Sequence, residues 1–132
     1  MTKRILDDVK VNVKWKISAL WGALMFLFIY ADYFASLQPE HLELIEITQG
    51  LLLFGAISMT IPSVMIFLSL FLKPNINRWA NIVLGIVYTG LIISTLISFE
   101  EPWAYFIFYS VVEFALTLLI VWYAWKWPKQ EA

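Results

Sequence analysis

The sequence predicts an all-α integral membrane protein, an up-down bundle of four transmembrane helices with both termini in the cytoplasm. Hydrophobic residues make up 61% of the 132 residues and charged residues only 14%, whereas about a quarter of the residues of a soluble domain are charged. Four apolar runs are each long enough to cross a bilayer, which takes about 20 helical residues. The connections between the runs are short, so consecutive helices must run antiparallel.

The N-terminal segment, residues 1–16, is polar and charged, and the first span is expected at about 17–36. Basic residues ahead of an apolar run also occur in signal peptides. This run of about 20 residues, however, is longer than a typical signal-peptide core, and its end offers no small-residue cleavage site. We therefore expect the first helix to be retained.

The second span is expected at about 51–72 and contains a proline, Pro62. Proline frees one backbone carbonyl in a helix, and Ser58 or a neighbouring helix would satisfy that carbonyl. We expect a bend near Pro62. The preceding segment, 37–50, is either a loop or an outward extension of this span, since Pro39 suits the first turn of a helix.

A turn at 73–78 leads to the third span at about 79–98, and a second turn leads to the fourth span at about 103–125. Residues 126–132 form a polar tail. In the third span, Gly85 and Gly90 would allow close helix approach, because small residues favour packing in membranes. Asn81 lies near the interface, where we expect it to cap a helix or tie a loop.

The distribution of charge predicts the orientation. All nine Lys and Arg residues lie on the side shared by the N-terminal segment, the second loop and the tail, whereas the first and third loops have glutamates instead. By the positive-inside rule, that shared side is cytoplasmic. Six of the seven tryptophans lie near the ends of spans, and only Trp21 lies inside one.

Glu113 is the first candidate for a functional residue. It follows Trp103 by ten residues, which places it about 15 Å deep in a hydrocarbon layer about 30 Å thick. A charged carboxylate there costs roughly 2.5 kcal/mol or more, so it needs a partner, a cavity or a proton. Tyr109, Ser110 and Thr117 share its helix face. Two interpretations remain open: a proton-linked or cation-binding carboxylate, or a protonated acid that hydrogen-bonds to a neighbouring helix.

Asp32 is the second candidate. By helical rise it lies about 7 Å from the outer end of the first span, as an acid at a cavity mouth or as an interfacial residue that reaches water. It differs from Glu113 in depth by about 8 Å, so the two acids would need a water or a tyrosine between them to share a proton. Thr60 lies at a depth similar to that of Glu113 and would hydrogen-bond to it if their helices are neighbours.

Composition excludes several functions. A net charge of −1 argues against a nucleic-acid partner, and the lack of cysteine excludes thiol chemistry. The single histidine, His41, lies among glutamates without the spacing of a metal site, which indicates a solvated loop. The sequence has no nucleophile–base pair, no phosphate-binding loop and no pair of haem-ligating histidines. We therefore expect no enzyme activity, no cofactor and no metal, while a lipid or quinone pocket lined by aromatic residues stays open.

Four stretches carry a resemblance to a known family: Tyr30-Ala31-Asp32, Met59-Thr60-Ile61-Pro62, Arg78-Trp79-Ala80-Asn81-Ile82 and Glu113. Together they resemble an uncharacterised family of small four-span bacterial membrane proteins, a domain of unknown function that is loosely DoxX-like. The similarity covers about Trp15 to Trp127. The family pattern often has an acid before the Ile-Pro, where this chain has Thr60, so a carboxylate pair would be reduced to Glu113. The resemblance implies a multi-pass protein of the bacterial inner membrane and implies no activity.

Three functional hypotheses follow. In the first, the protein binds or transports a small apolar or cationic molecule, exchanging it for a proton at Glu113 with Asp32 at the outer mouth. Tyr109, Ser110 and Thr60 would complete that site. In the second, it is a non-transporting scaffold or accessory subunit. In the third, it is a subunit that binds a lipid or quinone. The expected partners are the lipid bilayer, the small ligand and a second copy that completes a shared cavity.

Overall fold

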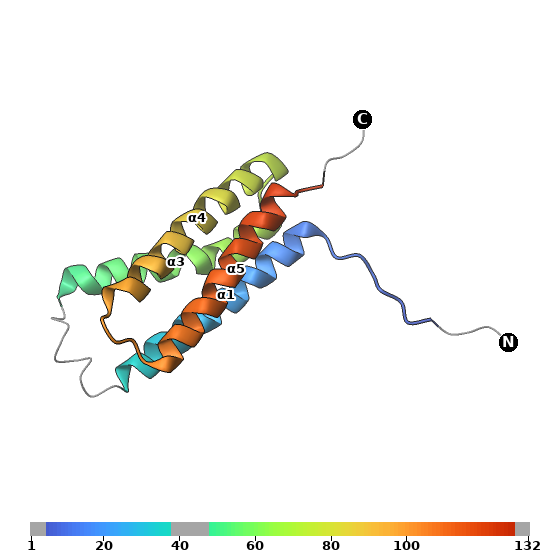
Figure 1. Ribbon diagram of the computed structural model, residues 1–132. Coiled ribbons are helices and arrows are strands. Elements are labelled where there is room, and N and C mark those ends of the chain that lie inside the picture. The colour runs from blue at the N-terminus through green and yellow to red at the C-terminus, as the bar shows by residue number, and fades with distance from the viewer. Residues whose placement is uncertain (1–4, 38–47, 129–132) are drawn as a thin grey trace.

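The computed structural model describes residues 5–37 and 48–128 (Figure 1). These residues form four helices: α1 (Val13–Ser36), α3 (Gln49–Phe71), α4 (Pro74–Ser98) and α5 (Ala104–Trp125). Each helix is long and apolar enough to cross a membrane. The prediction of an all-α fold with four helices of membrane-spanning length is therefore confirmed.

The helices run up and down, and both ends of the chain leave from the same end of the bundle (Figure 1). We call this end the basic end, because Lys14, Lys73, Arg78 and Lys126 lie there at the helix termini. The opposite end is called the acidic end, after Glu100 and Glu101 in the connection between α4 and α5.

The four helices form a ring with one weak side. α4 packs most extensively on α5, and α1 packs on both α3 and α5, whereas α3 and α4 barely touch. Across the diagonals of the ring, the described parts of α1 and α4, and of α3 and α5, make no close backbone contact. The order around the ring is therefore α1, α3, α4, α5, with the least packing between α3 and α4.

The helix starts follow local chemistry. Asn12 caps α1 by accepting a hydrogen bond from the Lys14 backbone N–H at 2.9 Å, and Thr48 caps α3 in the same way. Because Thr48 has an extended backbone, α3 begins only at Gln49. The expected outward extension, with Pro39 and His41, lies outside the described residues. α4 begins earlier than expected, at Pro74, since a proline at the first helical position loses no hydrogen bond.

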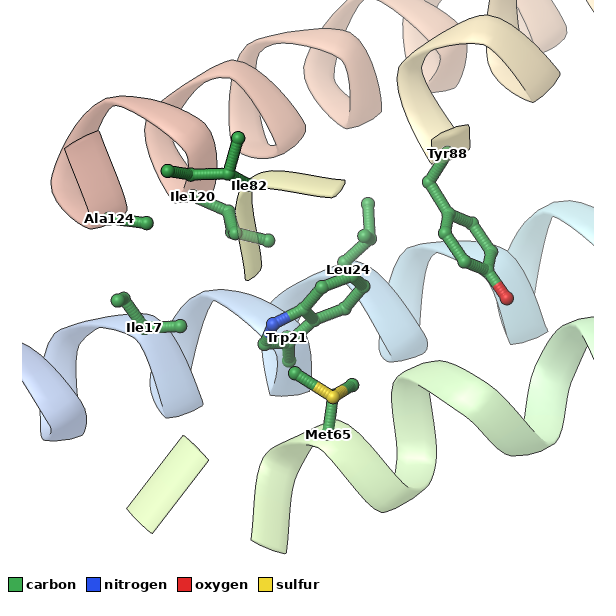
Figure 2. Close-up of a cluster of buried hydrophobic side chains, with 8 residues drawn as sticks. All are labelled: Ile17, Trp21, Leu24, Met65, Ile82, Tyr88, Ile120 and Ala124. Carbon is green, nitrogen blue, oxygen red and sulfur yellow. The ribbon is translucent and has the colours of Figure 1, made fainter. Parts of the chain in front are cut away.

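The apolar core lies in the half of the bundle nearer the basic end (Figure 2). Trp21 is fully buried at its centre, and Figure 2 shows Met65 beside it. The remaining members of this cluster are Ile17, Leu24, Ile82, Tyr88, Ile120 and Ala124. A buried indole needs a partner for its N–H, and Trp21 Nε1 donates to Asn81 Oδ1 at 2.6 Å.

A buried amide network connects three helices next to this core. Asn81 donates to the Asn77 carbonyl oxygen at 2.8 Å and to Asn77 Oδ1 at 2.6 Å. Asn77 in turn donates to the Ser69 carbonyl oxygen at 2.7 Å. Both asparagines are fully buried, and with Trp21 they join α1, α3 and α4. Asn81 therefore ties helices to one another, and the prediction that it caps a helix or ties a loop was wrong, because its side-chain partners all lie within helices.

Gly85 explains the tight packing between α4 and α5. A Cβ added at Gly85 would lie 2.5 Å from Val121 Cγ2 and 3.5 Å from the Thr117 carbonyl oxygen, so the helices can approach this closely only with glycine there. A Cβ added at Gly90 would meet no atom within 4 Å. The predicted close approach therefore occurs at Gly85, and the prediction was wrong for Gly90.

Candidate functional site

A partly open cavity of about 280 Å³ lies between the helices, beyond the core and toward the acidic end. Residues from all four helices line it. The bundle is therefore divided along its length into a packed half and a hollow half. Tyr88 belongs both to the core and to the cavity wall and marks the boundary between the two halves.

Glu113 lies in the wall of this cavity and is only 6% exposed. Tyr109 and Ser110 line the cavity with it, as a shared helix face requires. Thr117 lies one turn nearer the basic end and contacts α4 instead, with its hydroxyl 2.8 Å from that of Thr89. The polar stripe predicted on this helix therefore points into the bundle. Its part nearer the acidic end, with Tyr109, Ser110 and Glu113, faces the cavity.

Asp32 reaches the same cavity from α1. Its carboxyl lies near enough to act electrostatically on the carboxyl of Glu113. Asp32 and Glu113 are the acidic residues that the four described helices contain. The structure thus gathers both acids of the apolar helices at one site.

Aromatic rings form much of the remaining wall. Phe28 and Tyr88 lie side by side, with ring centroids 6.1 Å apart, and Phe106 and Tyr109 line the cavity from α5. On the side where α1 meets α5, Phe34 stacks on Tyr109 at 6.2 Å. These contacts join α1 and α5 beside the cavity.

Tyr88 also closes the bottom of the cavity. Its hydroxyl donates to the Ser58 carbonyl oxygen at 2.6 Å, and Figure 2 shows this hydroxyl directed toward α3. Ser58 precedes Pro62 by four residues, so it is the carbonyl that loses its helical partner because proline has no N–H. A neighbouring helix therefore satisfies the freed carbonyl, which is one of the two solutions that the sequence left open.

Thr60 does not lie where the sequence-based hypothesis put it. Its side chain is exposed on α3, and its hydroxyl donates to the Ala56 carbonyl oxygen of the same helix at 2.7 Å. Because α3 and α5 are diagonal in the ring, a hydrogen bond between Thr60 and Glu113 is not formed. A similar depth in the membrane did not make these residues neighbours.

Sequence reasoning did not identify Phe28 and Ser58 as parts of the site. Aromatic residues make up 17% of the chain, so one phenylalanine in an apolar run carries little signal. The useful signal is spacing, because Phe28 precedes Asp32 by four residues and so shares its helix face. For Ser58, the signal is its position four residues before a proline within a helix.

The cavity offers a ligand two carboxyl groups, hydroxyl groups and aromatic faces. In the part of the chain that the structure describes, His, Asp and Glu side chains do not gather in groups of three that suit a metal ion. The segment around His41, which we expect to be a solvated loop, lies outside the described residues. The cavity wall therefore combines carboxyl, hydroxyl and aromatic groups from all four helices.

Comparison with known proteins gives one match. No curated protein and no solved structure matches the chain. A family model described as a family of unknown function, DUF6326, matches residues 5–132. This agrees with the resemblance to an uncharacterised family, while the DoxX-like layout and the bacterial origin stay predictions. The match covers almost the whole chain, and the protein therefore belongs to the family of unknown function DUF6326.

Proposed function

We propose that this membrane protein binds a small organic cation in the cavity and exchanges it for a proton at Glu113. The observation that carries the proposal is the meeting of Asp32 and Glu113, the two acids of the apolar helices, in one aromatic-lined cavity. Acidic residues within membrane spans are rare and are functional candidates by default.

The wall chemistry supports a cation over an anion or a neutral molecule. A carboxylate forms strong, charge-assisted contacts with a cation. Aromatic faces such as those of Phe28 and Tyr88 attract a cation within about 6 Å of the ring centroid. The cavity of about 280 Å³ is close to the smallest ligand pockets, which begin at about 300 Å³. These features favour a compact ammonium ion with an apolar or aromatic substituent.

Proton exchange follows from the pair of acids. Two carboxylates that face one cavity repel each other when both are charged. A bound organic cation or a bound proton relieves this repulsion, so the two compete for the site. Glu113, the more buried acid, is the group at which we expect this competition to occur.

The test is equilibrium binding to the protein in nanodiscs. The probe is trimethylphenylammonium, and its neutral isostere tert-butylbenzene controls for shape and lipid partitioning. We expect the protein to bind the cation and not the isostere. Glu113→Gln should weaken cation binding roughly 10- to 100-fold, because two opposite unit charges about 5 Å apart attract by roughly 3 kcal/mol at an effective dielectric constant of about 20. Glu101→Gln, in the α4–α5 connection, is the matched control and should bind like the original protein.

Two further measurements define the outcome. Release of protons on cation binding, followed with a pH-sensitive dye in weakly buffered solution, should disappear in Glu113→Gln. Equal binding of the cation and its isostere, or an unchanged affinity in Glu113→Gln, would overturn the proposal. If Glu113→Gln instead alters only thermal stability or oligomeric state, the acid serves helix packing and the scaffold hypothesis is preferred.

We also propose that both termini are cytoplasmic in a bacterial inner membrane. The support is that cationic residues at the helix termini gather at the basic end, which the positive-inside rule assigns to the cytoplasm. Because the chain has no cysteine, the single variants Asn75→Cys and Glu100→Cys give a clean test. In intact cells, a membrane-impermeant maleimide should label only Glu100→Cys, and the reverse pattern would contradict this orientation.

A further inference from the structure

The ring of helices is closed on three sides. α4 and α5 meet closely at Gly85, and α1 and α5 meet through Phe34 and Tyr109. α1 and α3 are joined by the Ser18 hydroxyl, which donates to the Ile66 carbonyl oxygen at 2.8 Å. The α3–α4 side lacks comparable packing, so it is the side on which the hollow half of the bundle can open.

The hydrogen bonds that cross from α3 to α4 lie at the boundary between the two halves or nearer the basic end. Tyr88 is bonded to Ser58 at the boundary between the two halves, and Asn77 is bonded to Ser69 near the basic end. Toward the acidic end, residues from both helices line the cavity. An opening between α3 and α4 would therefore lie at the level of the cavity.

The residues that border this opening are apolar, and one of them is a glycine. Phe54 on α3 is 61% exposed and Leu91 on α4 is 37% exposed, and both line the cavity. Next to Phe54, Gly55 also lines the cavity, and a Cβ added there would meet no atom within 4 Å. Such a surface on helices of membrane-spanning length is suited to hydrocarbon and not to water.

We propose that the ligand is a single-chain cationic amphiphile taken from the bilayer, with its ammonium head at Asp32 and Glu113 and its alkyl chain leaving the cavity between α3 and α4. This inference rests on the cation binding proposed above and adds the chemical class of the ligand. The charges of the two acids match a cationic head, and the apolar rim matches one alkyl chain. The chain stays in contact with lipid throughout, so it does not have to fit inside the cavity.

The test compares two cations with the same kind of head, trimethylphenylammonium and decyltrimethylammonium, in nanodiscs. Affinities are expressed per mole fraction in the bilayer, with empty nanodiscs as the reference for partitioning. Because lipid surrounds the alkyl chain in both the free and the bound state, we expect the two affinities to agree within about threefold. A cavity without an opening would reject the longer cation at least tenfold.

Substitutions that block the opening distinguish binding of the alkyl chain from binding of the ammonium head. We expect Gly55→Trp to weaken binding of decyltrimethylammonium at least tenfold and that of trimethylphenylammonium less than threefold. Gly90→Trp is the matched control, because Gly90 is also a helical glycine with open space around its added Cβ but does not line the cavity. If Gly55→Trp does not fold, Leu91→Trp narrows the opening from α4.

A third measurement locates the chain directly. A decyltrimethylammonium analogue with a terminal diazirine, activated by light, should label the rim residues of α3 and α4, as mapped by mass spectrometry. Labelling confined to α1 and α5 would overturn the inference. The inference would also be overturned if Gly55→Trp lowered the affinities for both cations equally. It would be overturned as well if Gly55→Trp and Gly90→Trp lowered the affinity for decyltrimethylammonium equally.

Failure of the inference and failure of the proposed function give different results. If trimethylphenylammonium does not bind in a manner that depends on Glu113, the proposed function itself is wrong. If it does bind in that manner but the longer cation is rejected, the function stands and the ligand is a compact cation without a chain.

Discussion

Replacing Tyr88 by phenylalanine removes one hydroxyl and leaves the packed ring in place. That hydroxyl donates to the Ser58 carbonyl oxygen, whose helical partner is missing because of Pro62. The ring contacts with Trp21 at 5.9 Å and with Phe28 at 6.1 Å are available to phenylalanine as well. The change therefore isolates a single hydrogen bond between α3 and α4.

The size of the effect follows from the environment. Hydrogen bonds between membrane helices contribute about 0.6 kcal/mol on average and up to about 1.7 kcal/mol. The 2.6 Å bond is short, and Ser58 has no other donor at the position that Pro62 leaves empty. We therefore expect Tyr88→Phe to lower the free energy of unfolding by about 1–1.5 kcal/mol, toward the upper end of that range.

A double-mutant cycle with Pro62→Ala tests the physical reason. Alanine restores a backbone N–H that can donate to the Ser58 carbonyl oxygen, so in this background Tyr88→Phe should cost less than about 0.5 kcal/mol. The assay is reversible unfolding in mixed micelles followed by circular dichroism. If Tyr88→Phe costs the same with and without Pro62, the hydroxyl does not serve the carbonyl freed by proline and the reasoning is refuted.

Two further predictions concern the packed half of the bundle. Gly85→Ala should destabilise the protein by about 1–2 kcal/mol because the new methyl group overlaps Val121, whereas Gly90→Ala should leave stability unchanged or raise it by up to about 1 kcal/mol. Asn81→Leu should lower the free energy of unfolding by about 2–3 kcal/mol, because it leaves the buried Trp21 N–H without an acceptor. The same unfolding assay measures the effects at Gly85, Gly90 and Asn81.

Controls distinguish these effects from general damage. Val121→Ala should rescue Gly85→Ala if the overlap is the cause, and equal effects at Gly85 and Gly90 would count against close packing. Asn75→Leu, at an exposed site in the first turn of α4, should change stability by less than about 0.5 kcal/mol. If Asn81→Leu is equally mild, the amide network does not hold the helices together.

The number and length of the helices were accessible from the sequence because a bilayer imposes them. A span needs about 20 apolar residues, and four such runs stand out in the chain. The direction of the polar stripe on α5 was also accessible, since Tyr109, Ser110 and Glu113 lie on one face at helical spacing. Both inferences use only distances within one helix.

The contacts between helices were not accessible in the same way. Depth along the membrane normal placed Thr60 level with Glu113, but it does not say which helices are adjacent, and α3 proved to be diagonal to α5. Depth also separated Asp32 from Glu113 by about 8 Å. Their place in the wall of one cavity agrees with the hypothesis of a shared site, but it depends on the packing of α1 on α5, which depth does not give. Neighbour order and helix rotation depend on packing partners far apart in sequence.

The contacts of the first helix with the last two have a consequence for biosynthesis. Trp21 of α1 cannot form its hydrogen bond until Asn81 has been synthesised, 60 residues later in the chain. At synthesis rates of about 5–20 residues per second, this delay is roughly 3–12 s. The α1–α5 contact comes later still. Until then the nascent α1–α3 hairpin exposes an indole N–H and the face that α4 and α5 will cover. During this interval, insertion factors or lipids must shield that face, and the ring closes only when the final helix is made.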